Sequence, residues 1–192
     1  MKPNIFYLII FACVFFFTSC SQNRPQKVYL EYGCKITIPT PVTLGNPFTA
    51  HHSLNFQAKE KSLQMQAQLE FENNILTIVG LNTAFATIFS LKQVENKIEY
   101  IANIKTPIKP KFILGTYYLI FMNAKDIPKI LPSNVTCQED ITPTGVVRKI
   151  FIGKRQIFNI EYLPFKNGTK ITFHNLKRDL VFTIIEDYRT NL

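Results

Sequence analysis

Three histidines are the first residues of this sequence to consider for chemistry, because an imidazole can bind a metal or transfer a proton. His51 and His52 are adjacent, and His174 is the third. Adjacent residues of a regular strand point to opposite faces of a sheet, so His51 and His52 cannot ligate one ion from such a strand. No Cys or carboxylate stands at zinc-ligand spacing from them. We therefore expect surface histidines and no metal site.

The motifs of common catalytic and nucleotide-binding sites are missing from the sequence. It contains no glycine-rich phosphate loop, no G-x-S-x-G elbow, no H-E-x-x-H and no paired catalytic carboxylates. Sequence order leaves open a triad that assembles only in space. We nevertheless do not expect an enzyme, and no cofactor is implied.

Cys20 is the residue with the clearest expected chemistry, which is lipidation. The apolar run Ile5–Phe17 follows a short basic start; it is shorter than the roughly 20 residues that span a bilayer and is typical of a signal peptide. It leads into Thr-Ser-Cys20-Ser21, which resembles a bacterial lipobox. We predict that residues 1–19 are a lipoprotein signal peptide and that Cys20 is acylated. Secretion with cleavage after Ser21 is the alternative.

The residues after Cys20 predict where the protein would lie. Residues 20–35 begin with a polar stretch and are expected to be a lipidated tether, in which Val28–Tyr32 is either a turn of helix or an extended piece. Ser21, rather than Asp, follows the Cys, which resembles an outer-membrane address. The expected location is therefore the periplasmic side of a bacterial outer membrane. The membrane is the expected partner, because the acylated Cys20 would anchor the protein in it.

Cys34 and Cys137 remain once Cys13 leaves with the signal peptide and Cys20 is acylated. In an oxidising periplasm, a disulfide between them would close a loop of about a hundred residues and contribute about 4 kcal/mol in the chain-entropy model. Two free buried thiols are the alternative. The sequence leaves both open.

Composition limits the partners of the chain. Its 192 residues are 46% hydrophobic, with 17 Phe, 8 Tyr and no Trp, and its formal net charge is +9. That is enough apolar content for a real core and suits a β-rich protein. The Lys and Arg residues are scattered, with no run longer than two, so we do not expect nucleic-acid binding. A basic balance also attracts anionic lipid headgroups.

Residues 48–104 carry the pattern of five consecutive strands. In Ser62–Phe71, apolar residues alternate strictly with Gln and Glu, which predicts a strand with one dry and one wet face. Ala84–Lys92 is also predicted to be a strand, with Phe85 and Phe89 on one side. The turns between these segments are short, so the strands must be antiparallel neighbours.

Lys111–Met122 is predicted to be a helix, because Pro110 suits a first helical turn and apolar residues recur at helical spacing. A buried strand is the alternative. The segment is apolar all round and must be covered on most sides. A second short helix or turn is expected at Asp126–Pro132. Further strands are predicted at Val135–Gln138, Val146–Ile152, Gln156–Leu163, Thr169–Asn175 and Leu180–Asp187.

Three apolar segments, Ile38–Gly45, Leu76–Leu91 and Phe112–Leu119, resemble an uncharacterised bacterial lipoprotein family, domain of unknown function 3261. The likeness covers most of residues 36–187. That family is similar in expected fold to the lipoprotein carriers LolA and LolB, an unclosed β-barrel with helices in its concave face. The resemblance implies a mainly β (α+β) antiparallel half-barrel of roughly ten strands, with one or two short helices, over residues 36–192. It supplies no catalytic residues.

On that fold, we expect a lipid-like or acyl-chain ligand to be bound or transferred between the sheet and the helix. The residues expected to line this space are Met65, Leu69, Phe71, Phe85, Phe89, Tyr100, Leu114, Tyr118 and Phe121. Each of them could instead be plain core. The alternative function is a structural or assembly lipoprotein that docks a membrane-protein partner of the envelope without a ligand.

Overall fold

The computed structural model describes residues 25–59, 61–103, 109–166 and 168–192. The expected signal peptide, Cys20 and the first residues of the expected tether lie outside these ranges. None of the helices within the ranges is both long and apolar enough to cross a bilayer.

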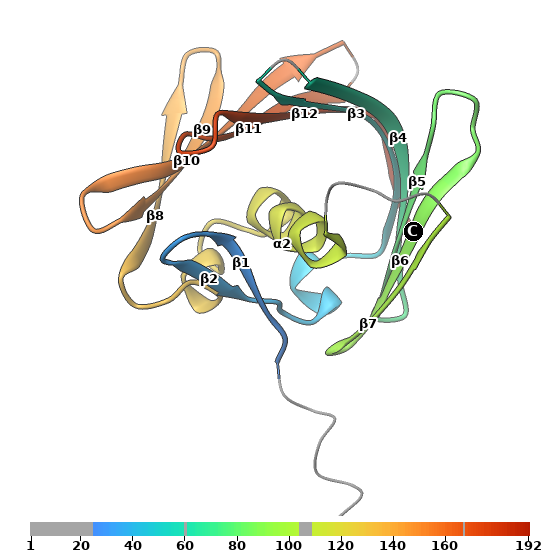
Figure 1. The fold of residues 1–192 in the computed structure, drawn as a ribbon, viewed down its shortest axis with the longest axis horizontal. Helices are drawn as coiled ribbons and strands as arrows, with labels where there is room; N and C mark the ends of the chain where they lie inside the picture. Colours follow the sequence, from blue (N-terminus) through green and yellow to red (C-terminus); the bar gives the residue numbers. More distant parts are fainter. Residues whose placement is uncertain (1–24, 60, 104–108, 167) are drawn as a thin grey trace, which may run out of the picture.

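The described residues form one large antiparallel sheet of ten strands. The strands are β3 (Phe48–Ala58), β4 (Lys61–Glu72), β5 (Ile75–Leu81), β6 (Thr87–Val94), β7 (Lys97–Ala102), β8 (Val135–Thr142), β9 (Gly145–Ile152), β10 (Arg155–Phe165), β11 (Gly168–Asn175) and β12 (Leu180–Asn191). Their order in the sheet is β7-β6-β5-β4-β3-β12-β11-β10-β9-β8. The sheet curls into a half-barrel that does not close, because its two ends, β7 and β8, do not pair with each other (Figure 1).

Two meanders make up this sheet. The first, β3 to β7, is the series of five strands that the sequence predicted, and the second runs from β8 to β12. They join where β12 pairs with β3, with Phe182 opposite Phe56 and Ile184 opposite Leu54. Burial alternates along β3, so one face of the strand packs inward. Asn73 and Asn74 form the β4–β5 turn with positive φ, a conformation that Asn tolerates.

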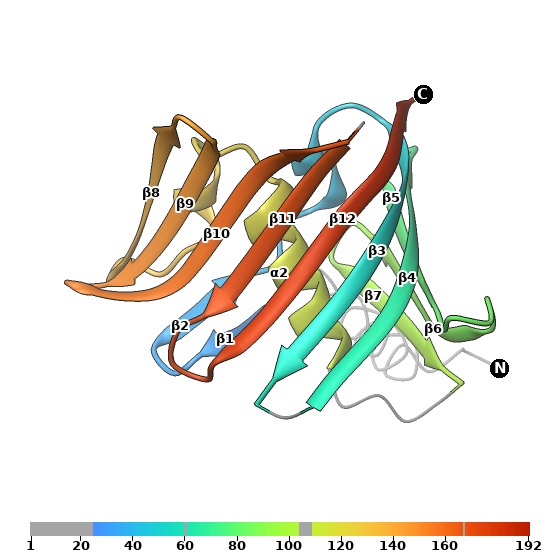
Figure 2. The same ribbon diagram turned by 90° about the horizontal axis from the view of Figure 1, so that it is seen from above.

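One helix, α2 (Pro110–Phe121), lies in the concave face of the sheet (Figures 1 and 2). A hairpin of β1 (Lys27–Glu31) and β2 (Cys34–Thr37) covers its other side. Two short 3₁₀ helices, η1 (Pro41–Leu44) and η2 (Ile127–Lys129), lie with the hairpin on the open side of the half-barrel.

Gly115 explains how the hairpin can pack so tightly against α2. A Cβ atom at this position would lie only 2.8 Å from Val28 Cγ1 and 3.1 Å from Leu30 Cδ2. The glycine that weakens the helical pattern in the sequence is thus what allows the hairpin to approach. The helix is apolar all round because protein covers it on both sides.

The structure confirms the predicted mainly β half-barrel and the helix that begins at Pro110; the buried-strand alternative for this segment is wrong. The boundary drawn at residue 36 needs correction. Val28, Leu30 and Cys34 are buried, so the last part of the expected tether belongs to the folded domain. Of the two conformations considered for Val28–Tyr32, the extended one is confirmed for β1.

Candidate functional site

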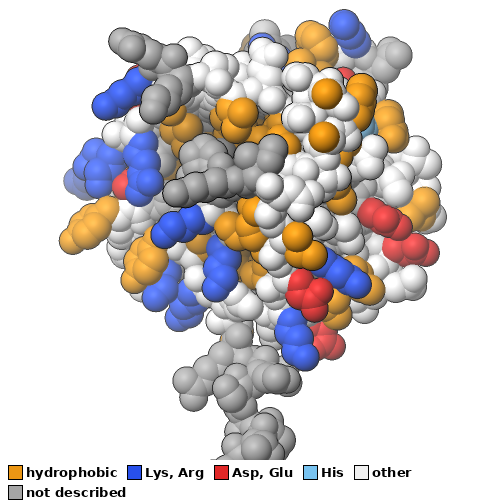
Figure 3. Space-filling view, turned by 45° about the vertical axis from the view of Figure 1, so that its right-hand side comes forward, with side chains coloured by type: hydrophobic (Ala, Val, Ile, Leu, Met, Phe, Trp, Pro, Cys, Tyr) orange, Lys and Arg blue, Asp and Glu red, His pale blue; other side chains and the backbone are white. Residues whose placement is uncertain are grey.

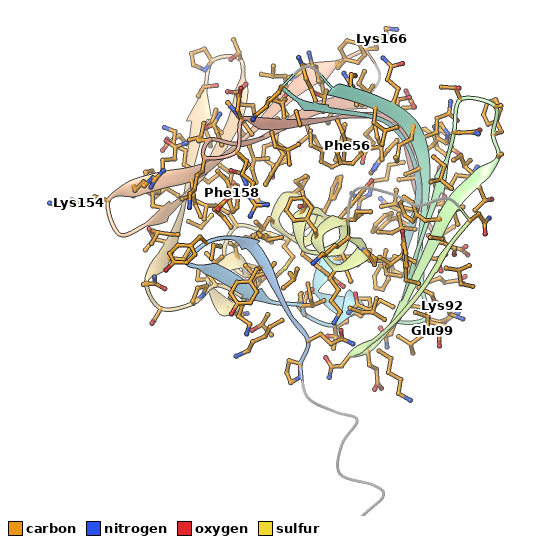
Figure 4. The ribbon with its side chains drawn as sticks, in the orientation of Figure 1. Phe56, Lys92, Glu99, Lys154, Phe158 and Lys166 are labelled. Carbon is orange, nitrogen blue, oxygen red and sulfur yellow. The ribbon has the colours of Figure 1, made fainter. Side chains whose placement is uncertain are left out.

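The space between α2 and the sheet was the expected ligand site, and side chains fill it. The cavity that remains there has a volume of about 10 Å³, whereas ligand pockets usually measure about 300–1,000 Å³. Figure 4 shows Phe56 and Phe158 pointing from the sheet into the space around the helix. The residues that line the small cavity are Leu44, Phe48, Leu69, Leu76, Tyr117, Tyr118 and Phe121.

Most of the residues predicted to line the ligand space lie at this interface or in the core beside it. Leu69, Tyr118 and Phe121 line the small cavity itself. Tyr100 is partly buried and packs against the core. Its ring centre lies 6.0 Å from that of Phe89. The others that are buried in the core are Met65, Phe71, Phe89 and Leu114.

Phe85 does not belong to this group, and its prediction was wrong. Its side chain is 67% exposed, and its backbone has a positive φ of 62°. The Asn82 side chain accepts hydrogen bonds from the Ala84 and Ala86 N–H groups, which makes this segment a turn. The strand β6 therefore begins only at Thr87.

His52 is buried, which corrects the expectation that both histidines are on the surface. Its ring packs against both Tyr117 and Phe121, with centroid distances of 5.9 and 5.3 Å, and those two rings also contact each other. Its Nε2 lies 3.3 Å from Glu186 Oε2, while His51 faces Asp187 on the outside. The sequence could have predicted this burial. Successive residues of a strand point to opposite faces, so one of the two adjacent histidines on β3 must point inward. The described residues contain no group of three or more His, Cys, Asp or Glu placed to hold a metal ion.

The carboxyl end of α2 is held by Arg148, a residue that the sequence did not single out. The buried guanidinium donates hydrogen bonds to the carbonyls of Leu119 and Ile120 and forms an ion pair with Glu139 at 2.8 Å. The Tyr162 hydroxyl also donates to the Ile120 carbonyl, at 2.7 Å. A positive charge at this position satisfies last-turn carbonyls that have no partner within the helix, and it interacts favourably with the negative end of the helix dipole.

Gln93 holds the middle of the helix. The Tyr118 hydroxyl donates a hydrogen bond of 2.8 Å to Gln93 Oε1. The Gln93 amide in turn donates to the carbonyls of Pro39 and Glu95. Burial raises the pKa of the Tyr118 hydroxyl, so it remains a donor at neutral pH. The amide connects α2, β6 and the segment before η1.

A second, larger hollow lies on the open side of the half-barrel, and we call it the groove. Its volume is about 550 Å³, within the usual range of ligand pockets. Ile38, Val42, Met122 and Ile130 make part of its wall apolar. Polar residues, including the Lys129–Asp126 ion pair, also contribute. The remaining lining residues are Pro25, Thr37, Pro39, Thr40, Thr43 and Asn96.

η1 and the end of α2 lie between the groove and the interior. Val42 and Thr43 of η1 line the groove, whereas Leu44 lines the small inner cavity. Likewise, Met122 faces the groove and Phe121 faces the inner cavity. The two hollows are therefore neighbours on either side of η1 and the end of α2.

Cys34 and Cys137 are both free thiols in the structure. Cys34 is fully buried in β2, and burial, together with the nearby Glu31 charge, raises the pKa of its thiol to about 11. Burial also raises the pKa of the Cys137 thiol. Neither has the lowered pKa of a reactive cysteine.

Comparison with known proteins identifies the class to which this half-barrel belongs. Residues 49–186 match the model of a family described as protein of unknown function (DUF3261). The chain belongs to this family, as the resemblance in the sequence predicted.

Neither a function nor a ligand comes with that family. No curated protein matches the chain. Among solved structures, the crystal structure of LolA superfamily protein NE2245 from Nitrosomonas europaea is similar, with a TM-score of 0.46 and 7% sequence identity. The alignment covers 77% of this chain and 86% of that one.

Proposed function

We propose that this protein is an outer-membrane-anchored lipoprotein of the bacterial envelope that binds an acyl chain of a lipid in the groove and passes it on. The groove is the single observation that carries the proposal. It has the volume of a ligand pocket, while the space between α2 and the sheet is filled. The bound chain would reach that inner space only when η1 moves.

The lining of the groove suits a lipid in two ways. Ile38, Val42, Met122 and Ile130 offer apolar contact, and each methylene that they remove from water contributes about 0.8 kcal/mol. The Lys129 ammonium at the groove can pair with a lipid phosphate in place of Asp126.

The location of the groove suits a protein that is anchored to a membrane through its amino terminus. Pro25 lines the groove and lies only five residues after Cys20 in the sequence. An acylated Cys20 would therefore keep the groove close to the bilayer from which a lipid could enter.

Native mass spectrometry tests the ligand. The unlipidated chain from Ser21, incubated with phospholipid vesicles and repurified, should carry an adduct with the mass of one lipid. Val42→Asp should abolish the adduct, because it places a charge in the groove at a half-exposed position that tolerates change. Val94→Asp, at an exposed position that does not line the groove, is the matched control. A chain that stays empty, or an adduct that survives Val42→Asp, contradicts the proposal.

Labelling with a palmitate analogue tests the anchor. Cells that express the full chain should incorporate the label into this protein, and Cys20→Ala should abolish incorporation. Cys34→Ala should keep it, because Cys34 is buried in the folded domain. Label that persists in Cys20→Ala excludes acylation of this cysteine.

The filled interior favours a second candidate, a structural or assembly lipoprotein that docks a membrane-protein partner. The sheet ends at β8, where Ile141 is 90% exposed, and an edge strand is a ready surface for pairing with another chain. A photo-crosslinking residue at position 141 should then capture one envelope protein in cells. This result together with an empty groove would favour the second candidate.

A further inference from the structure

We infer that the outer face of the β1–β2 hairpin is a docking surface for the anionic phospholipid headgroups of a membrane. Burial alternates along the hairpin: Val28 and Leu30 point inward to α2, whereas Lys27, Tyr29 and Lys35 point outward. Tyr32 follows at the turn, and the side chains of Tyr29 and Tyr32 are 65% and 84% exposed. We call Lys27, Tyr29, Tyr32, Lys35 and the neighbouring Lys177 the hairpin face.

Each exposed tyrosine of the hairpin face has a lysine beside it. The Lys35 ammonium lies 4.7 Å from the centre of the Tyr29 ring. The Lys177 ammonium lies 5.1 Å from the centre of the Tyr32 ring. Tyrosine rings are enriched at the headgroup level of bilayers, where they keep an apolar body and a polar tip. Lysines beside them can reach lipid phosphates, which is the charge complement of an anionic surface.

The hairpin face is held rigidly against the sheet. Glu31 is buried beneath it and accepts hydrogen bonds from Asn175 and Arg178 of the turn region between β11 and β12. It also lies 3.4 Å from the Lys177 ammonium. The carboxylate thus carries little charge to the surface, and the lysines dominate what a membrane would meet.

The short stretch between Cys20 and Pro25 indicates that the partner of the hairpin face is a membrane. This step rests on the acylated Cys20 of the proposed function, but not on a ligand in the groove. Pro25 is five positions after Cys20, and at full extension this stretch reaches about 17 Å. A domain of this size is about 40 Å across. Only the surface beside Pro25 can therefore rest on the bilayer, and Lys27 and Tyr29 follow at once.

The views of the molecule agree with this orientation. The hairpin, η1 and η2 lie on the open side of the half-barrel, where β1 leads back toward the amino terminus (Figure 1). Figure 3 shows Lys and Arg side chains mixed with hydrophobic ones on the left of the face in view. Because Pro25 also lines the groove, docking through the hairpin face would bring the groove to the membrane.

Vesicle binding tests the docking surface directly. The unlipidated chain from Ser21 contains every described residue, and it should co-sediment with phosphatidylglycerol vesicles but weakly with phosphatidylcholine vesicles. Lys27→Glu together with Lys35→Glu should lower the partition coefficient at least about tenfold, since each basic residue near an anionic surface is worth about fivefold. Tyr29→Ser together with Tyr32→Ser should also lower it, at unchanged thermal unfolding midpoint, because both side chains are exposed.

Lys166→Glu is the matched control. Lys166 also lies over an aromatic ring, that of Phe165, at 5.3 Å, but it projects from the opposite side of the molecule (Figure 4). Binding that falls in Lys166→Glu as much as in Lys27→Glu alone, which changes the net charge by the same amount, would reflect net charge alone and overturn the assignment. A chain that binds no vesicle of either composition overturns it as well. Both outcomes are independent of the lipid adduct that tests the groove.

Discussion

Arg178 donates a hydrogen bond of 2.8 Å from its Nε to Oε2 of Glu31, although the two residues are 147 positions apart. Burial would raise the pKa of the Glu31 carboxyl. The hydrogen bonds from the Tyr32 N–H, Asn175 and Arg178 outweigh it and lower this pKa to about 2. The contact fastens the amino-terminal hairpin to the turn between β11 and β12, in the middle of the sheet, and so holds the hairpin over α2.

Glu31→Gln tests this fastening through the pH dependence of stability. The pKa of Glu31 falls from about 4.5 in the unfolded chain to about 2 in the folded one, so its contribution is complete above pH 4.5 and is lost as the pH falls toward 2. Over that window, the free energy of unfolding should drop by up to about 3 kcal/mol more in the wild type than in Glu31→Gln. Urea unfolding at pH 7 and at pH 2 measures it.

Asp140→Asn is the control for Glu31→Gln, because the Asp140–Lys149 pair is on the surface and such pairs contribute little. Its pH dependence should match that of the wild type. Equal slopes for Glu31→Gln and the wild type would mean that the carboxylate does not stabilise the fold.

Local patterns were sufficient to predict most strands and the helix. The alternation of apolar and polar residues in β4 and the Asn73-Asn74 turn are properties of neighbouring residues. The pairing of β12 with β3, by contrast, joins segments more than a hundred residues apart. The sequence did not predict this pairing, because no local pattern specifies which distant strand is the partner.

The site was harder to predict because volume depends on packing. The sequence showed that α2 is apolar on all sides, but not that the hairpin would cover it at Gly115. Whether the space beneath is hollow depends on side chains from many strands. The groove was missed for the same reason, since Ile38, Val42 and Met122 come together only when the hairpin and η1 fold against the end of α2.

Gly115→Val should destabilise the protein by about 1–3 kcal/mol, because the new side chain would be forced into Val28 and Leu30. Thr116→Val, at the next position, adds the same β-branched side chain without this collision and removes a buried hydroxyl that has no partner within the described residues. Its free energy of unfolding should change little or rise.

Val28→Ala provides the second check on Gly115. This change shortens the side chain whose Cγ1 would lie 2.8 Å from the new Cβ. In a double-mutant cycle, Val28→Ala should recover part of the stability lost in Gly115→Val. Strict additivity of the two losses would show that the hairpin does not pack on this glycine.

Tyr118→Phe should destabilise the protein by about 1–3 kcal/mol, because it leaves the buried Gln93 Oε1 without its donor. Tyr32→Phe, which removes an exposed hydroxyl, should have almost no effect. Thermal and urea unfolding compare the two variants. A Tyr118→Phe protein as stable as the wild type would indicate that Gln93 does not hold the helix.

Cys34 should be unreactive in the folded protein. With a thiol pKa of about 11, only about one molecule in a thousand carries the nucleophilic thiolate at pH 8, and the side chain is fully buried. A thiol reagent should therefore modify the partly exposed Cys137 first and Cys34 only at the rate of unfolding. Peptide mapping of the Ser21–Leu192 chain after timed labelling measures both rates.

Cys137→Ser is the control and should leave a single, slow reaction, that of Cys34. Rapid labelling of Cys34 would show that the hairpin opens without global unfolding. A linked Cys34–Cys137 peptide would support the disulfide alternative.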